Sequence, residues 1–272
     1  MERKIANSLA RDYLFEKVMK PKIHIASCSF GKDSIATILL ALENNEPLDR
    51  VVFSEVMFDI NRNISGEIPE HIEWIYSTAI PKLEQMGVKV DIVRADTDYM
   101  YWFHHIPNGK YKGKKEGFLI GGMCKLNSMC KVKPIKQYYK QFAEFELVKY
   151  IGIAIDEPER LARLRGGRGI SLLAKYGYTE QMAMELCRKY DLVSPIYQTG
   201  TRGGCWFCPN AKIKSFAELK NNHPHLWQEL VELSKESNLI SQNFKYGMTL
   251  QEVERKIKNL DLNKKLQLKL DL

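Results

Sequence analysis

The stretch from Ile23 to Leu42 places a tight, glycine-containing turn between a short apolar run and a helical pattern. The run Ile23–Cys28 has the composition of a buried parallel strand. From Ser34 onward, apolar residues recur at helical spacing, at Ile35, Ile38, Leu39 and Leu42. These patterns predict a strand, a tight turn and a helix in succession.

The turn, Ser29-Phe30-Gly31-Lys32-Asp33-Ser34, has the chemistry of a phosphate or pyrophosphate site. Gly31 lets the backbone approach a ligand closely, and the helix N-terminus supplies free N–H groups and a positive dipole end. Lys32 adds a cation, and Ser29 and Ser34 add hydroxyl groups. The spacing is not that of a Walker-type loop. The alternative is an ordinary strand–turn–helix with a chance Gly-Lys-Asp-Ser.

Three later segments predict further strands: Arg50–Phe58, Val88–Val93 and Leu147–Ile155. A helical pattern that opens at Pro69 and closes at Gly87 lies between the first two. Strands that alternate with helices predict an α/β fold with a doubly wound parallel sheet. Ligands of such sheets bind beyond the carboxyl ends of the strands, where the glycine turn and Asp59 fall.

We predict one nucleotide-binding domain over residues 1–210 and a helical C-terminal extension over residues 211–272. The domain would include an amphipathic helix over Met1 to Lys20, a helix over Pro134–Phe145 and a helix capped by Thr179. In the extension, Thr249 and Glu252 have the spacing of a capping box.

Composition predicts a cytoplasmic protein without a membrane partner. No apolar run approaches the ~20 residues of a membrane span, and the N-terminus has no secretory signal. The formal charge of +8 is concentrated in the lysine-rich segment 110–140 and in Arg160, Arg163, Arg165 and Arg168. Such enrichment attracts a polyphosphate, a nucleic acid or a sulfated nucleotide, with a solvated basic face as the alternative.

The segment Asp98 to Gly122 is aromatic and basic without a steady period, which predicts a long loop or a small excursion. We expect its histidines, His104 and His105, to have surface or packing roles. Cys187, on a predicted helix face, is interpreted as a core residue.

Four of the six cysteines occur as two pairs in glycine-bearing sequence. Cys205 and Cys208 form a C-x-x-C turn, whereas five residues separate Cys124 from Cys130. Four thiolates suit a tetrahedral zinc ion or an iron–sulfur cluster, and the sequence leaves both open. Two other interpretations also stay open: Cys124 as a bystander, and Cys205 with Cys208 as a redox dithiol.

Together these features resemble the phosphoadenylyl-sulfate (PAPS) reductase-like family of the adenine nucleotide alpha-hydrolase superfamily, the PP-loop ATP pyrophosphatases. Ser29–Ser34 is similar to the superfamily's S-x-G-x-D-S loop. Gly152–Arg160 is similar to the family's later strand and substrate-binding turn. Cys130–Pro134, with the C-x-x-C pair, is similar to the framework that holds a 4Fe–4S cluster in several members. The similarity covers roughly Lys22 to Asn210.

The resemblance, together with the sheet-edge position of Asp59, implies a set of site residues. The implied nucleotide contacts are Ser29, Phe30, Gly31, Lys32, Asp33, Ser34, Asp59, Gly152 and Ile153. The implied catalytic residues are Lys32, Asp33 and Arg160, and the implied substrate contacts are Lys133, Asp156, Glu157 and Arg160. The metal ligands would be Cys124, Cys130, Cys205 and Cys208. The implied cofactors are ATP (or PAPS or adenylyl sulfate), Mg²⁺ and a 4Fe–4S cluster, with Zn²⁺ as its alternative.

The chain departs from the reductases of this family. It lacks their adjacent cysteines, and no cysteine follows Cys208 to act as the reductase nucleophile. We therefore expect an ATP pyrophosphatase that adenylates a substrate for sulfur insertion, as in DNA phosphorothioation or tRNA thiolation. Its expected partners are an adenine nucleotide, a nucleic-acid substrate, a sulfur-donor protein and a second copy of the chain.

Two alternatives stay open. The first is a PAPS or adenylyl-sulfate reductase that releases sulfite and uses thioredoxin. The second is a nucleotide-sensing module that binds nucleic acid through the lysine-rich segment without turnover.

Overall fold

The computed structural model describes residues 20–120, 123–164, 169–198 and 203–270, with side chains as far as residue 260. The helix predicted over Met1 to Lys20 lies almost entirely outside the described residues. The chain forms two compact units whose segments alternate along the sequence. The first comprises Met1–Phe53, Ile80–Asp91 and Lys136–Val193, and the second Ser54–Ala79, Ile92–Ile135 and Ser194–Leu272.

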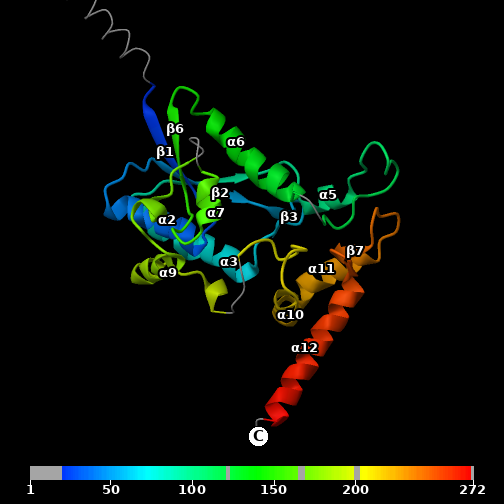
Figure 1. The fold of residues 1–272 in the computed structure, drawn as a ribbon. Coiled ribbons are helices and arrows are strands. Elements are labelled where there is room, and N and C mark those ends of the chain that lie inside the picture. Colours follow the sequence, from blue (N-terminus) through cyan, green and yellow to red (C-terminus); the bar gives the residue numbers. More distant parts are fainter. Residues whose placement is uncertain (1–19, 121–122, 165–168, 199–202, 271–272) are drawn as a thin grey trace, which may run out of the picture. The chain divides into compact units, whose positions relative to one another are not determined.

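A four-stranded sheet forms the centre of the first unit, in the order β5-β2-β1-β6 (Figure 1). β1 (Lys22–Ser27) runs parallel to β2 (Arg50–Glu55) on one side and to β6 (Glu146–Ile151) on the other. β5 (Val90–Arg94) completes the sheet beside β2. The predicted doubly wound α/β fold is confirmed. Because successive strands are added first on one side of β1 and then on the other, the order reverses beside β1, where such sheets bind ligands.

Helices α2 (Lys32–Glu43) and α9 (Glu180–Lys189) pack on each other in the first unit. Every residue of α2 from Ser34 to Ala41 is buried, as the apolar pattern predicts. Thr179 caps α9 by accepting a hydrogen bond from the Met182 N–H at 3.2 Å, which confirms the predicted cap. The shorter helices of this unit are α4 (Ile80–Gln85), α6 (Lys133–Lys140), α7 (Pro158–Ala162) and α8 (Leu172–Lys175).

The strand predicted over Arg50–Phe58 is interrupted, so this prediction is wrong in its second half. β2 ends at Glu55, and β3 (Met57–Asp59) pairs with β4 (Ile64–Ser65) in an antiparallel ladder. The Val56 carbonyl accepts a hydrogen bond from the Gly66 N–H at 2.7 Å, which directs the chain away from the parallel sheet.

The ends of one strand and one helix, and one segment predicted as a loop, also differ from the sequence-based expectation. β6 ends at Ile151, four residues before the predicted end, and α6 ends at Lys140 rather than at Phe145. The segment interpreted as a loop contains helix α5 (Tyr99–His104), which Asp98 caps by accepting from the Tyr101 N–H at 2.7 Å.

The second unit is built around an aromatic core that includes Phe58, Tyr99 and Phe207. The Tyr99 and Phe207 rings lie 4.3 Å apart between centroids, and Phe58 stacks on Tyr99 at 5.2 Å. The helical run predicted from Pro69 is present as α3 (Pro69–Trp74) and a π-helical turn (Ile75–Ala79), and it continues into α4 of the first unit. A second π-helical turn (Asn127–Val132) and a 3₁₀ turn (Pro195–Tyr197) also belong here.

The C-terminal part of this unit contains α10 (Ile213–Asn222), α11 (Pro224–Ser234) and α12 (Leu250–Leu270). A small hairpin, β7 (Asn243–Lys245) and β8 (Met248–Thr249), precedes α12. The predicted capping box is confirmed: Glu252 accepts from the Thr249 N–H at 2.8 Å, and its own N–H donates to the Thr249 hydroxyl at 3.3 Å. None of the helices described here is both long and apolar enough to cross a membrane.

Candidate functional site

The turn between β1 and α2 holds Phe30 in the left-handed region, with a φ of +55°. Bulky residues rarely adopt this conformation, so its strain must be offset by packing. The Phe30 ring is fully buried and meets the Phe53 ring edge-on at 5.2 Å. Because its ring is in the core, Phe30 can serve the predicted nucleotide site only through its backbone.

Gly31 is the N-cap residue of α2, and without a side chain it cannot cap that helix end itself. Its carbonyl accepts from the N–H groups of Ser34 and Ile35, each at 3.1 Å. The Ser34 hydroxyl donates to the same carbonyl at 2.9 Å and accepts from the Ser29 N–H at 3.3 Å. The loop is therefore braced from within by Ser34, while Ser29 is exposed.

Gly152, the residue after β6, lies directly against this loop. A Cβ atom at this position would lie 2.6 Å from the Asp33 carbonyl carbon and 2.7 Å from the Ser34 nitrogen. Only glycine permits so close an approach between two backbones. The structure thus brings Gly152 beside the predicted phosphate loop. The next residue, Ile153, is buried and its carbonyl accepts from the Ser171 hydroxyl at 2.6 Å.

Lys32 lies between two carboxylates. Its ammonium Nζ is 2.9 Å from Asp33 Oδ1 and 2.7 Å from Oε2 of Glu180, at the start of α9. Burial lowers the pKa of Lys32, but the bonds from Glu180 and Asp33 outweigh it and the net pKa is raised. Burial also raises the pKa of Asp33, against the opposing effect of Lys32. Lys32 is therefore held as a cation at the mouth of the loop.

The turn after β6 uses its acidic residues internally. Asp156 accepts from the Glu180 N–H at 3.1 Å, and Glu157 accepts from the Ala154 N–H at 3.2 Å. Arg160 forms an ion pair with Glu157 and stays half exposed. Of the predicted substrate contacts in this turn, Arg160 therefore offers a half-exposed guanidinium to a ligand.

Two predicted residues belong to the second unit. Asp59 lies in β3, where it accepts from Arg62 Nε at 2.6 Å, and Arg62 also pairs with Glu229. The residue at the end of the parallel strand β2 is Glu55, which accepts from Tyr76 at 2.6 Å and from Arg94. Lys133 is exposed at the start of α6.

The four predicted metal ligands also lie in the second unit, but not as a ready ligand set. Among the residues that the structure describes, no three His, Cys, Asp or Glu side chains are arranged to hold a metal ion. Cys130 is buried, and its thiol donates to the Thr97 carbonyl at 3.2 Å. Cys208 and Cys124 are near enough to Cys205 for their charges to act on its thiol, and Cys124 acts on Cys130 in the same way. The four thiols therefore share one neighbourhood, but they are not arranged as a ligand set in this structure.

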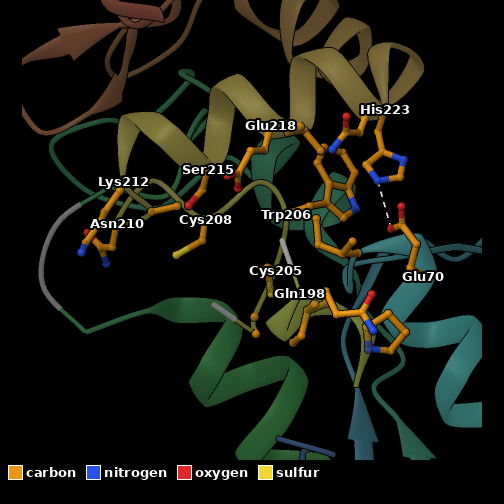
Figure 2. A pocket seen from close by; sticks show the side chains of 18 residues that line it. Glu70, Gln198, Cys205, Trp206, Cys208, Asn210, Lys212, Ser215, Glu218 and His223 are labelled. Carbon is orange, nitrogen blue, oxygen red and sulfur yellow. Dashed lines mark ion pairs between the residues drawn. The ribbon is translucent and has the colours of Figure 1, made fainter. Parts of the chain in front are cut away.

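Cys205 is half-buried, and the resulting desolvation raises the pKa of its thiol, with the charge of Glu67 adding to the effect. Thiols that resist ionisation are poor nucleophiles. The environment of Cys205 thus disfavours its interpretation as a redox nucleophile. Both cysteines of the C-x-x-C turn line a cavity in the second unit (Figure 2).

The lysines of the lysine-rich segment fall into two groups, according to whether they form an ion pair. Lys115 and Lys125 form ion pairs with Glu236 and Glu116, respectively. In the described part of the chain no ion pair involves the exposed Lys110, Lys112 or Lys114. His104 and His105 bond to Glu236 and Glu116, so both histidines hold this segment in place. Arg165 and Arg168 lie outside the described residues.

Sequence reasoning missed two acidic residues. Glu180 is 148 positions from Lys32, and its only signal is its place just after the Thr179 cap. Glu67 is buried, which raises its pKa, and it accepts a hydrogen bond from the Gly204 N–H beside the C-x-x-C turn. Cys187 is fully buried as predicted, and its thiol also donates to the Lys32 carbonyl at 3.3 Å.

Comparisons with known proteins find limited similarity. No protein-family model matches the chain. The uncharacterized protein MJ0066 of Methanocaldococcus jannaschii is 23% identical over 224 residues, which cover 79% of this chain. The chain spans only 42% of that relative's length. The solved structure of the U34-tRNA thiolase NcsA from Methanococcus maripaludis, with its 4Fe–4S cluster, matches 89% of this chain and 74% of its own at 15% identity and a TM-score of 0.39. Similarity at this level does not establish a shared function.

Proposed function

We propose that the chain binds ATP at Ser29–Ser34, cleaves it to AMP and pyrophosphate, and so adenylates a substrate for sulfur insertion. The observation that carries this proposal is the loop itself. A strained Phe30, an N-cap glycine and the close approach of Gly152 hold the start of α2 beyond the carboxyl end of β1. Helix N-termini at this place in a parallel sheet favour phosphate groups.

The chemistry follows from the charges around the loop. An acceptor oxygen would attack the α-phosphorus, the bond from that phosphorus to the bridging oxygen would break, and pyrophosphate would leave. Lys32 and the helix N-terminus are suited to stabilise the leaving pyrophosphate. Arg160 carries an exposed guanidinium suited to charge at the α-phosphate. A sulfide equivalent would then displace AMP from the adenylated acceptor.

The carboxylate of Asp33 is an oxygen donor of the kind that Mg²⁺ prefers, which fits the predicted magnesium. Bound with the nucleotide, magnesium would neutralise phosphate charge. The cysteines do not form a ligand set in this structure, so no step proposed here depends on a bound cluster.

Of the alternatives, the reductase would need Cys205 or Cys208 as its nucleophile, and the environment of Cys205 disfavours that role. A nucleic-acid acceptor is supported by the exposed Lys110, Lys112 and Lys114, beside which Tyr111 is 43% exposed. Lysines interleaved with an exposed aromatic ring suit phosphates and bases together.

We expect Glu180→Gln to lower the KM for ATP about two- to fivefold, because Lys32 must leave this carboxylate to reach a phosphate. The range is that of a half-exposed ion pair. Steady-state kinetics of AMP release measures the effect, with kcat expected to change little. Glu185→Gln, an exposed substitution on the same helix, is the matched control. A raised KM in Glu180→Gln would show instead that Glu180 holds Lys32 in its productive position.

We expect metal binding to depend on Cys205 and not on Cys130. The thiol of Cys130 already donates to Thr97 and has one cysteine near it, Cys124, whereas Cys205 has two, Cys124 and Cys208. Protein purified without oxygen is analysed for iron and zinc, for the wild type and for Cys205→Ser and Cys130→Ser. The expected result is bound metal in the wild type and in Cys130→Ser, and its loss in Cys205→Ser. Equal loss of bound metal in both variants would support instead the four-cysteine site predicted from the sequence.

A further inference from the structure

A cavity of about 670 Å³ lies in the second unit beside the C-x-x-C turn (Figure 2). Cavities that bind small molecules usually have about this volume, roughly 300–1,000 Å³. The loop of the proposed ATP site belongs to the first unit, so this cavity is a separate feature. Both Cys205 and Cys208 contribute to its wall.

One wall of the cavity is a single face of α10. Lys212, Ser215, Glu218 and Asn222 line it at spacings of three or four residues, which places their side chains on one side of a helix. Apolar side chains of Ile68, Ile196 and Leu219 form other parts of the lining. Trp206 also lines it, and its indole N–H donates to the Ser65 carbonyl at 2.9 Å, which fixes the ring.

Glu70, Glu218 and His223 of the lining have ion-pair partners, whereas the exposed Lys212 has none among the described residues. His223 pairs with Glu70 at 3.0 Å (Figure 2), and Lys214 lies 3.8 Å from Glu218. Gln198, Asn210 and Asn222 are exposed at the rim of the cavity, and among the described residues their side-chain amides have no hydrogen-bond partner in the chain. Each amide offers one acceptor and a pair of donors. The cavity therefore presents amide donors and acceptors, and the ammonium group of Lys212, beside apolar and aromatic surface.

We propose that this cavity receives a nucleobase of the acceptor substrate. An uncharged planar ring with adjacent donors and acceptors at its edge matches the amides, and its faces match Trp206 and the apolar side chains. This inference rests on the proposed function, since it identifies the acceptor as a base-bearing molecule presented next to the C-x-x-C thiols. The amide groups of the lining determine which base binds, and the apolar side chains supply most of the surface that the base would bury.

The test is calorimetric titration of the full chain with uridine, cytidine, adenosine and guanosine, without ATP. We expect at least one nucleoside to bind with one site per chain. Asn222→Ala should weaken that binding by up to about tenfold, which corresponds to the net contribution of one hydrogen bond. Ser215→Leu should abolish it, because the larger side chain enters the cavity. Asn221→Ala and Asn221→Leu, on the same helix but outside the lining, are the matched controls and should leave it unchanged.

Two results would overturn the proposal. The first is that no nucleoside binds, or that binding is unaffected by Asn222→Ala and Ser215→Leu. The second is that cysteine or glutathione binds with this dependence on Asn222 instead, which would make the cavity a site for a small thiol. Because the titration contains no ATP, its outcome is independent of adenylation. Base binding without AMP formation would refute the proposed function alone, and AMP formation without base binding would refute the cavity assignment alone.

Discussion

Replacing Lys32 by alanine is expected to lower AMP formation from ATP at least about 100-fold, the usual cost of removing one charge-stabilising donor from an active site. Lys32 is the cation of the loop, and its ammonium is held within 3 Å of Asp33 and Glu180 at the start of α2. The measurement is the rate of AMP release at saturating ATP. Circular dichroism of the same samples should show an unchanged fold, because Lys32 is not part of the apolar core.

Lys82→Ala is the matched control for Lys32→Ala. Lys82 belongs to the same unit and also approaches a carboxylate, at 3.9 Å from Asp191, but it lies on α4 away from the loop sequence. We expect full activity in this variant. If Lys32→Ala and Lys82→Ala released AMP at equal rates, Lys32 would have no part in the reaction.

Replacing Gly152 by alanine is expected to remove nucleotide binding. The added methyl group would lie 2.6–2.7 Å from the backbone of Asp33 and Ser34, so either the loop or the end of β6 must move. Overpacking of this kind costs about 1–3 kcal/mol of stability, and a displaced loop no longer presents its N–H groups to a phosphate. Calorimetric titration with ATP and thermal unfolding together measure the two effects.

Gly169→Ala separates steric strain from damage to the loop. A Cβ at Gly169 would lie 2.7 Å from the flexible end of the Ile151 side chain, in the same unit. This variant should therefore lose some stability and still bind ATP. Loss of ATP binding in both variants to the same extent would mean that the contact between Gly152 and the loop has no special role.

The strand, turn and helix around Ser29–Ser34 could be predicted from sequence because their signals are local. Apolar periodicity, one glycine and a helix start lie within a few residues of one another. The capping residues Thr179 and Thr249 were predictable for the same reason. The parallel sheet followed from the alternation of strands and helices, whereas the pairing of β1 with β6, more than a hundred residues apart, was not predicted.

Features that depend on distant contacts could not be predicted. The contact between Glu180 and Lys32 joins residues 148 positions apart. The break in the strand at Val56 depends on a hydrogen bond from Gly66. The spacing of the cysteines indicates two pairs of ligands, the C-x-x-C pair more strongly than the other, but it does not show that the buried thiol of Cys130 donates to the Thr97 carbonyl. The interleaving of two compact units along the chain has no signal in composition or linkers.

Helix α5 has a helix-start signal in the sequence, although the segment is predicted above as a loop. Asp98 is a good N-cap residue, and it precedes the aromatic run that forms the helix. The mixture of aromatic and basic residues obscures the helical period of this run. Tyr99, Trp102 and Phe103 are nevertheless buried, at the spacing of one helix face.

The most direct test of the proposed reaction is to identify the products formed from ATP labelled at the α-phosphate, with total RNA supplied as the acceptor source. The account predicts labelled AMP or an AMP-bearing acceptor, together with an equal amount of pyrophosphate, from the wild type and not from Lys32→Ala. Labelled ADP with free phosphate, or ATP left intact, would contradict it.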